Sequence, residues 1–250
     1  VRLRWFAAVA MAAAGAVAHA EVARQGTEYV LSRMSGDQIK PSVAIGTQGG
    51  VMAWEDNATD GDGQGISARL LTANGSVRGE RFRINEIAAG DQQNVQSVMM
   101  ADGATLFVWQ GGKPGFQKVS YRVLAPNGTF RTKEIQLSPA GSTDNRNPVA
   151  AALPDGGAVL AWTSQGLDRD MAGVAVQRID RNGVAAGSLI QANDYTAGNQ
   201  RSPAIAATQG GFAVAWVSEW QTGPERSDIY LRRYLNDGTP VGSISRANVG

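Results

Sequence analysis

Pro148-VAAALPDGGAVLA-Trp162 is the stretch that decides the fold, because closely related stretches occur four times along the 250-residue chain. Their closing tryptophans are 55, 53 and 54 residues apart. Self-similarity at a fixed period of this size indicates a repeat architecture, in which each period is one supersecondary unit. The other three copies are Pro41-SVAIGTQGGVMA-Trp54, Val95-QSVMMADGATLFV-Trp109 and Pro203-AIAATQGGFAVA-Trp216.

Each tryptophan is followed by a variable polar loop and then by a segment in which apolar and polar residues alternate. This alternation predicts a half-buried β-strand. The four segments are Ile66-SARLL, Val119-SYRVL, Val174-AVQRI and Ile229-YLRRY. A dipeptide that fits a two-residue hairpin turn comes next in every unit. These dipeptides are Asn74-Gly75, Asn127-Gly128, Asn182-Gly183 and Asp237-Gly238.

A further short strand and a polar connector complete each unit. The strands are Phe82-RIN, Ile135-QLS, Ile190-QAN and Ser245-RAN, which places the units at about 34–85, 86–138, 139–193 and 194–248. Four short antiparallel strands per period are typical of a β-propeller blade. We therefore predict an all-β chain of tandem four-stranded antiparallel repeats, arranged as a β-propeller of four blades or as part of a larger propeller or array. A linear or sandwich-like packing of the same sheets is the alternative.

One count bears on whether the ring closes. The last-strand motif occurs a fifth time, at Tyr29-Val30-Leu31-Ser32, whereas the tryptophan phrase occurs four times. In a ring that closes by exchanging one terminal strand, the two numbers would match. Because the two numbers differ, a fragment of a larger array stays an alternative to the closed four-bladed ring.

Residues 1–20 have the pattern of a secretory signal peptide. Two arginines precede an Ala/Val/Met-rich run that ends at Ala18-His19-Ala20, and this run is too short to be a typical membrane span. We expect cleavage after Ala20, so that residues 21–250 are the exported repeat domain. No later stretch approaches eighteen apolar residues, and the mature chain is therefore expected in the periplasm, outside the cell or at its surface, without a membrane span of its own.

Composition excludes several kinds of site. The chain has no cysteine, and its single histidine, His19, lies in the signal segment. A Ser-His-Asp triad, a cysteine nucleophile and an ordinary zinc site are thus unavailable to the mature chain. The mature chain has 21 basic against 22 acidic residues and no Lys/Arg run, which excludes a nucleic-acid partner. Chemistry here must use carboxylates, hydroxyls, lysine or arginine.

The loops after Trp54 and Trp162 are candidates for a metal site. Aspartates lie six and eight residues beyond each tryptophan, among glycines. Alternating carboxylates can offer several oxygen ligands to calcium, although no EF-hand loop is present. Aspartate and glycine also form ordinary turns, so a solvated hairpin is the alternative. The predicted calcium ligands are Asp56, Asp60, Asp62, Asp168 and Asp170.

Trp220 is an aromatic residue outside the repeat. It lies in a polar loop next to Glu219, and an indole among polar groups can stack on a sugar ring or anchor a peptide. We take Trp220 and Glu219 as candidate ligand-binding residues, with packing over an adjacent blade as the alternative for the indole. The four tryptophans of the repeat are expected in the core. Arginines that recur on the third strands are expected to pair with connector carboxylates and clamp neighbouring blades; they are Arg69, Arg122 and Arg232.

The repeat phrase, with its Asp/Gln-Gly-Gly and Asp-Gly-Asp-Gly-x-Gly-Ile motifs, resembles propeller-like tandem repeats of large secreted and surface proteins of bacteria. The resemblance covers the mature chain and implies an architecture and a location without one shared activity. We therefore expect an exported, non-enzymatic binding or adhesion module that recognises extracellular glycan, polymer or protein through its loops, with calcium as a possible ligand. A structural spacer and a carboxylate-dependent glycosidase or lyase using residues such as Glu55 and Glu219 are the alternatives.

Overall fold

The computed structural model describes residue 28 and residues 35–224 and 226–248. The predicted signal segment and the Tyr29–Ser32 motif lie outside the described residues. Residues 31–250 form one compact unit, and the description concerns this unit. Within the described part of the chain, no helix is long and apolar enough to cross a membrane.

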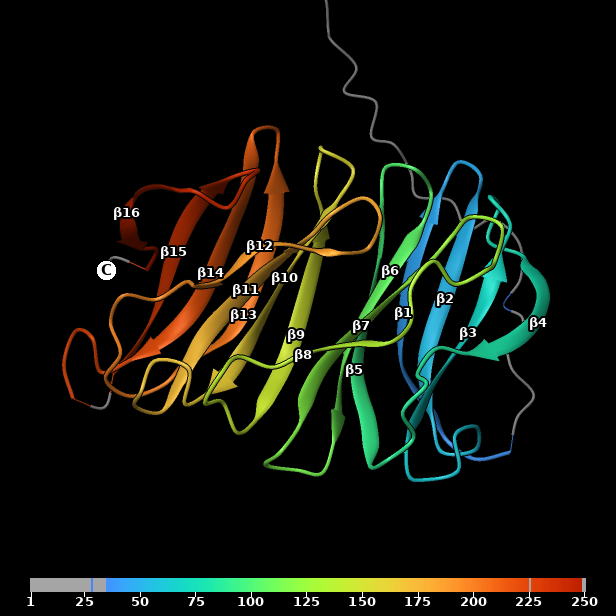
Figure 1. The fold of residues 1–250 in the computed structure, drawn as a ribbon, viewed down its shortest axis with the longest axis horizontal. Helices are drawn as coiled ribbons and strands as arrows, with labels where there is room; N and C mark the ends of the chain where they lie inside the picture. Colours follow the sequence, from blue (N-terminus) through green and yellow to red (C-terminus); the bar gives the residue numbers. More distant parts are fainter. Residues whose placement is uncertain (1–27, 29–34, 225, 249–250) are drawn as a thin grey trace, which may run out of the picture. The chain divides into compact units, whose positions relative to one another are not determined.

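Sixteen strands form four antiparallel sheets of four strands, each in simple sequential order (Figure 1). Sheet 1 consists of β1 (Gln38–Gly46), β2 (Gly49–Asp56), β3 (Gly65–Leu71) and β4 (Val77–Arg83). Sheet 2 consists of β5 (Asp91–Met99), β6 (Thr105–Gly112), β7 (Lys118–Leu124) and β8 (Ile135–Leu137). Sheet 3 consists of β9 (Asn145–Ala152), β10 (Ala158–Gln165), β11 (Ala172–Ile179) and β12 (Ala185–Gln191). Sheet 4 consists of β13 (Gln200–Thr208), β14 (Gly211–Glu219), β15 (Ser227–Leu235) and β16 (Pro240–Arg246). The predicted four-stranded units are confirmed.

Consecutive sheets stack face to face, and the core lies between them in three apolar layers. Trp109 packs in the layer between sheets 1 and 2, Trp162 between sheets 2 and 3, and Trp216 between sheets 3 and 4. Each tryptophan thus faces the preceding sheet, and we call this the backward face of its own sheet. The opposite, forward face carries small and β-branched residues, such as Val159 and Ala161 in sheet 3, which lie under the next tryptophan-bearing face. The prediction that the repeat tryptophans are core residues is confirmed, since all four are at most 4% exposed.

The hairpin turns differ from the prediction. At Asn74-Gly75 the Thr72 N–H donates to the Ser76 carbonyl at 2.8 Å, and the Gly75 N–H donates to the Thr72 carbonyl at 2.9 Å. Only the glycine has positive φ, +83°, so the loop is three residues long with glycine at the left-handed position. The other three turns repeat these hydrogen bonds. The prediction of two-residue turns is wrong, because asparagine here keeps negative φ.

Candidate active site

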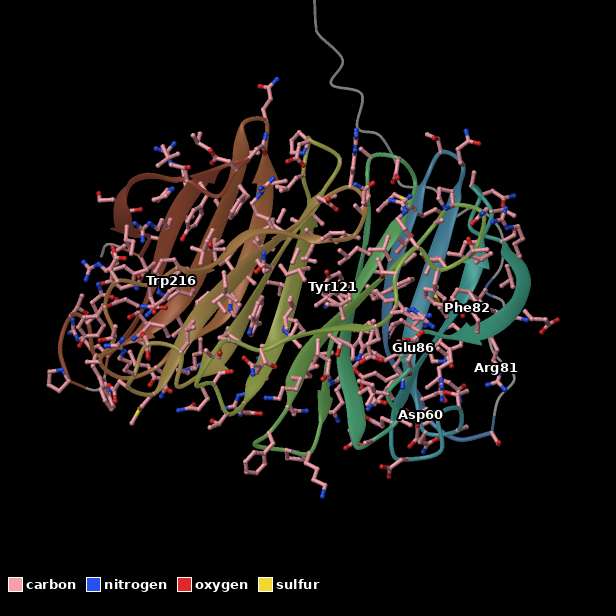
Figure 2. The ribbon with its side chains drawn as sticks, viewed as in Figure 1. Asp60, Arg81, Phe82, Glu86, Tyr121 and Trp216 are labelled. Atoms are coloured by element: carbon pink, nitrogen blue, oxygen red, sulfur yellow. The ribbon has the colours of Figure 1, made fainter. Side chains whose placement is uncertain are left out.

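One end of each sheet is built from the loop after its second strand and the connector that leads to the next sheet. We call this the connector end; Figure 2 shows Asp60 there, in the β2–β3 loop. The opposite end is formed by the short hairpin turns. Glu55 and Glu219 close β2 and β14 at the connector end.

A β-bulge near the connector end interrupts the first strand of every sheet. The residue in the bulge has positive φ although it is not glycine: Lys40 at 47°, Asn94 and Asn147 at 56°, and Ser202 at 54°. A bulge re-aims one backbone N–H and one side chain away from the ladder. In three sheets this N–H is aimed at the sheet before.

The acceptor is the side chain that follows the repeat tryptophan of the preceding sheet. Asn94 N donates to Glu55 Oε1 at 2.6 Å, Asn147 N to Gln110 Oε1 at 2.7 Å, and Ser202 N to Thr163 Oγ1 at 3.0 Å. Each contact therefore ties one sheet to the next. In sheet 4 the equivalent residue is Val217, so Glu55 is the only ionisable side chain at this repeated position.

Glu55 is fully buried. Burial is the largest cause of its raised pKa; the nearby Asp91 carboxylate adds to the rise, while the Asn94 N–H and the Lys40 ammonium oppose it. Lys40 Nζ lies 3.8 Å from Glu55 Oε1. The other oxygen, Oε2, forms no hydrogen bond with any described residue. A buried carboxyl group with a raised pKa and one free oxygen has the properties of a proton donor.

Asp91 is the second carboxylate near Glu55. Its Oδ1 accepts the Gln64 N–H at 3.0 Å, just as Asp144 Oδ1 accepts the Gln117 N–H at 2.8 Å in the next repeat. The two aspartates differ at the second oxygen: Asp144 Oδ2 faces Arg146 Nε at 3.5 Å, whereas no ion pair or hydrogen bond to a described residue is formed by Asp91 Oδ2. The chain has Gln93 where the later repeat has Arg146, and this leaves the charge of Asp91 to act on Glu55.

Polar side chains extend this site from sheet 1 into sheet 2. Lys40 Nζ donates to Asn94 Oδ1 at 2.8 Å, and Asn94 Nδ2 donates to Gln110 Oε1 at 2.9 Å. Gln110 Nε2 in turn donates to Gln117 Oε1 at 3.0 Å. The network holds the site rigidly on its inner side, while Lys40, half of whose side chain is exposed, is its most accessible member.

The predicted calcium ligands have hydrogen-bond partners within the chain. Asp60 Oδ2 accepts Asn85 Nδ2 at 3.0 Å, and Asp168 repeats the contact with Asn193 at 2.9 Å. Asp62 and Asp170 accept the N–H groups of connector glycines, and Asp56 accepts Ala58 N and Thr59 Oγ1. Among the described residues no group of three or more His, Cys, Asp or Glu side chains could hold a metal ion. These aspartates shape the connectors, and their role in calcium binding stays a prediction.

Glu219 and Trp220 both contact the connector that leads into sheet 4. Glu219 accepts Asn199 Nδ2 and Arg201 Nε, both at 2.8 Å, and these hydrogen bonds lower its pKa. Trp220 has a φ of +65°, its ring lies against Gly198, and it remains 44% exposed. The exposed indole thus lies beside the Glu219 carboxylate and the Arg201 guanidinium, a surface suited to binding a sugar ring. Both oxygens of Glu219 are occupied, in contrast to those of Glu55.

The arginine clamps are confirmed at two positions, with different partners from those expected. Arg122 of sheet 2 pairs with Glu86 at 2.7 Å and donates to the Ile84 carbonyl, and Arg232 of sheet 4 pairs with Asp194 at 2.8 Å. The partners lie at the start of each connector, while the predicted connector aspartates hold backbone N–H groups instead. Figure 2 marks Glu86 beside β4, on the connector into sheet 2.

From the sequence, Glu55 was only one of several candidate carboxylates. Its neighbours Lys40, Asn94 and Gln110 were not predicted. The signal was present in the position: each bulge residue directly precedes the Pro or Val that opens the repeat phrase, and each acceptor directly follows its closing tryptophan. The contact between these two positions across neighbouring sheets could not be predicted from the repeat alone.

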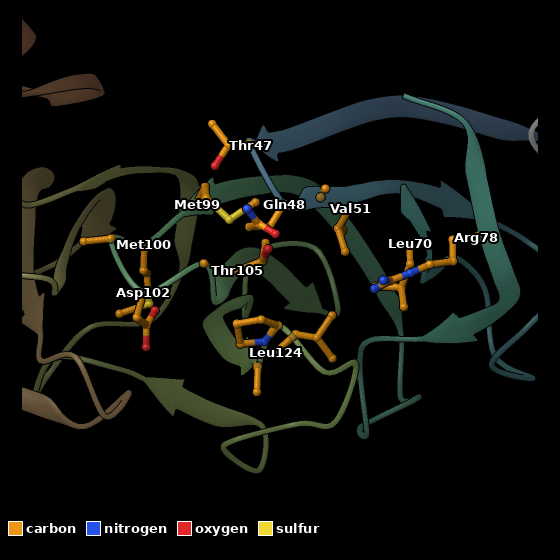
Figure 3. A pocket seen from close by; sticks show the side chains of 17 residues that line it. Thr47, Gln48, Val51, Leu70, Arg78, Met99, Met100, Asp102, Thr105 and Leu124 are labelled. Carbon is orange, nitrogen blue, oxygen red and sulfur yellow. The ribbon is translucent and has the colours of Figure 1, made fainter. Parts of the chain in front are cut away.

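A cavity of about 430 Å³ lies at the other end, between the turns of sheets 1 and 2. Figure 3 shows Leu70, Met99, Met100 and Leu124 among its lining residues, with Arg78 at one side. Asp102 is the one acidic residue in its lining, and Arg131 pairs with it at 2.7 Å. The cavity is therefore separate from the candidate active site, at the opposite end of β1 and β2.

No family model matches the chain, and no curated protein is similar to it in sequence. Solved structures do resemble it. The GH93 α-L-arabinofuranosidase of Fusarium graminearum, in complex with arabinobiose, aligns with a TM-score of 0.57 and 8% identity, over 84% of this chain and 65% of that chain. The fold is that of a β-propeller. A second α-L-arabinofuranosidase structure from Fusarium graminearum, with an iminosugar inhibitor, gives a TM-score of 0.56, 8% identity and coverage of 84% and 66%. A bat subtype N10 neuraminidase-like protein aligns with a TM-score of 0.52 and 9% identity, over 84% of this chain and 58% of that chain.

These likenesses confirm the predicted fold class and correct the predicted function. The expectation of a non-enzymatic binding or adhesion module is wrong: it relied on repeats without a shared activity, whereas solved structures with this fold are named as glycoside hydrolases. Glycoside hydrolysis, the activity in the names of those structures, belongs to the glycosidase alternative given above.

Proposed function

We propose that this chain is a carboxylate-dependent glycosidase whose proton donor is Glu55. The observation that carries the proposal is the fully buried Glu55 carboxyl group, held by Asn94 N at 2.6 Å where sheets 1 and 2 meet, with the Asp91 carboxylate near enough to raise its pKa. Each carboxylate is anchored through one oxygen by a backbone N–H of the neighbouring element, and each has its second oxygen free of hydrogen bonds to described residues. Two carboxyl groups in different environments are the groups that glycoside hydrolysis requires.

Glu55 supplies the proton for the leaving group. Its Oε1 accepts the Asn94 N–H, so the acidic proton belongs on Oε2, which has no partner to hold it back. Burial raises the pKa of Glu55 and keeps the group protonated to a higher pH than an exposed glutamate. Donation from Oε2 to the glycosidic oxygen lets the bond to the sugar break as positive charge develops on the ring. A water molecule then adds to the anomeric carbon, and the proton that it releases restores the acid.

Asp91 acts on that positive charge. Its negative charge already raises the pKa of Glu55, and the same field stabilises an oxocarbenium-like transition state nearby. The anchoring of Oδ1 by Gln64 N at 3.0 Å fixes the orientation of the carboxylate before the substrate arrives. Preorganisation of this kind avoids reorganisation during the reaction.

Lys40 tunes the pKa of Glu55. Its ammonium lies 3.8 Å from Oε1 and lowers the pKa of the acid, yet the side chain is half exposed and can move. A substrate that displaces Lys40 removes the cation that opposes the effect of burial on the pKa of Glu55. The pKa of Glu55 thus rises further when a bound sugar displaces Lys40.

The fold comparison suggests which substrates to test first. Pentofuranosides are the leading class, because the two most similar of the reported structures are α-L-arabinofuranosidases; sialosides follow from the neuraminidase-like structure. Export, which residues 1–20 predict, would bring the chain to extracellular or periplasmic polysaccharides. Trp220 and Arg201 would then bind further sugar units of the same polymer at the connector end.

The test is hydrolysis of alkyl α-L-arabinofuranosides, arabinan and alkyl sialosides by the wild type and by Glu55→Gln. Glutamine fits this position, since Gln110 accepts the equivalent N–H in sheet 2, so the variant keeps the fold. We expect a loss of about 10²–10⁴-fold in kcat, the usual contribution of a general acid. Glu80→Gln is the matched control, because the Glu80 side chain is 95% exposed and far from the reacting groups. Full activity of Glu55→Gln on a substrate that the wild type hydrolyses would refute the assignment, and a wild type inactive on the whole panel would refute the proposed substrates.

A further inference from the structure

The cavity between the turns of sheets 1 and 2 has largely apolar walls. Sheet 1 contributes Val51 and Leu70 to its lining, and sheet 2 contributes Met99, Met100 and Leu124. Its volume of about 430 Å³ is in the range of small-molecule binding sites. Methionine side chains are flexible and polarisable, so they adapt to the shape of an apolar ligand. These walls are therefore suited to the apolar part of a small molecule.

Arg78 brings a positive charge to this cavity. Figure 3 shows its side chain extending from β4 across Leu70, which is its partner in the β3–β4 register. Arg78 is exposed, and it forms no ion pair or hydrogen bond with any described residue. Asp102 is the other charged residue of the lining, and Arg131 neutralises it. A ligand in the cavity therefore meets one unpaired guanidinium.

Sheet 2 has an arginine at the position equivalent to Arg78. Arg78 lies opposite Leu70 on β3. Arg131 lies opposite Val123, the counterpart of Leu70 on β7, and its N–H donates to the Val123 carbonyl at 2.8 Å. The two arginines thus occupy one place in consecutive repeats, and their partners can be compared directly.

The two arginines differ in the acceptors that the chain provides. Arg131 donates to Asp102 Oδ2 at 2.7 Å in its own sheet and to the carbonyl of Arg181 in the next sheet. Sheet 1 has Gln48 where sheet 2 has Asp102, since each residue directly precedes the glycine of its turn. Arg78 therefore lacks the carboxylate that neutralises Arg131.

We propose that this cavity binds a small monocarboxylate with an apolar body, its carboxylate on Arg78 and its apolar part against Leu70 and Met99. The ligand then supplies the anion that Asp102 supplies in sheet 2. A guanidinium can bind a carboxylate through two parallel N–H···O hydrogen bonds, which are stronger than hydrogen bonds between neutral groups. The site lies at the opposite end of β1 and β2 from Glu55, so it does not depend on the proposed glycosidase activity.

The test is isothermal titration calorimetry of the wild type and of Arg78→Met with octanoate, and with octan-1-ol as the uncharged analogue. We expect one octanoate site per chain. Binding should weaken by at least about tenfold when either the guanidinium or the carboxylate is removed, because a hydrogen bond between charged groups is then lost. Octan-1-ol should bind the wild type and Arg78→Met equally. Arg233→Met is the control, since Arg233 is an exposed arginine of β15 outside the cavity lining.

Gln48→Asp is a second variant that keeps Arg78 and gives it an anion within the chain. The new carboxylate is expected to pair with Arg78 as Asp102 pairs with Arg131, and so to weaken octanoate binding by at least about tenfold. Gln48 and Arg78 are both exposed, and circular dichroism checks that the variants are folded.

Three results would overturn the proposal. They are a wild type without saturable octanoate binding, an octanoate affinity that is unchanged in Arg78→Met or in Gln48→Asp, and octan-1-ol binding as tight as that of octanoate. None of these results depends on the hydrolysis of a glycoside.

Discussion

Replacing Gln110 by leucine tests whether the side chain after each repeat tryptophan joins neighbouring sheets. Gln110 is 5% exposed, accepts Asn147 N at 2.7 Å and Asn94 Nδ2 at 2.9 Å, and donates to Gln117 Oε1 at 3.0 Å. Leucine has a similar volume but leaves all three groups without this partner. At about 1 kcal/mol for each stranded group, the lower end of the usual range, the loss is about 3 kcal/mol.

Urea unfolding followed by tryptophan fluorescence measures this loss directly. The midpoint should fall while the slope m stays unchanged, because the area exposed on unfolding is the same. For a chain of this length, about 3 kcal/mol corresponds to a fall of roughly 6–12 °C in Tm. Gln136→Leu is the control, since Gln136 is an exposed glutamine of β8 and its replacement should change stability by less than about 0.5 kcal/mol. If Gln110→Leu matched this control, the inter-sheet role of the position would be disproved.

Two further predictions concern ionisation. Lys40→Met removes the cation that lowers the pKa of Glu55, so the fall of kcat/KM on the alkaline side should move to higher pH; an unchanged or lower limb in the pH–rate profile would count against Lys40 as the control of this acid. Burial raises the pKa of Tyr121 and of Tyr234 to about 12. Stability from these phenols is complete below their unfolded value of about 10 and is lost as pH rises through about 12, so absorbance titration should show two of the five tyrosines ionising only as the chain unfolds, and their ionisation near pH 10 in the folded state would contradict the burial.

Most of the fold could be predicted because equivalent residues of the repeat phrase are buried in every copy. Trp109 and Trp162 close the same phrase and both are 0% exposed, and four copies make the alternation of strand faces readable without an alignment. The turn type was missed because Asn-Gly fits both a two-residue and a three-residue loop, and local sequence does not choose between them. The bulge was missed for a similar reason: the four bulge residues share a backbone conformation, yet they are lysine, asparagine, asparagine and serine, which no single sequence signal marks.

The site was harder to predict because its contacts join residues far apart in the chain. Glu55 meets Asn94 across 39 positions, and only the stacking of sheet 1 on sheet 2 brings them together. Asp60 and Asp168 look like metal ligands within their own loops, yet each is engaged by an asparagine 25 residues later. A pattern of carboxylates in one segment does not reveal which of them find partners elsewhere.

The dependence of hydrolysis on the leaving group tests the assignment of Glu55 most directly. A proton donor is needed when the departing group is a poor one, such as a sugar hydroxyl, and is nearly dispensable when it is an activated phenol. We expect Glu55→Gln to lose about 10²–10⁴-fold in kcat/KM on an arabinose disaccharide or alkyl arabinofuranoside but much less on a dinitrophenyl arabinofuranoside. An equal loss on both substrates would contradict it, because Glu55 would then act on binding or structure and not by donating a proton.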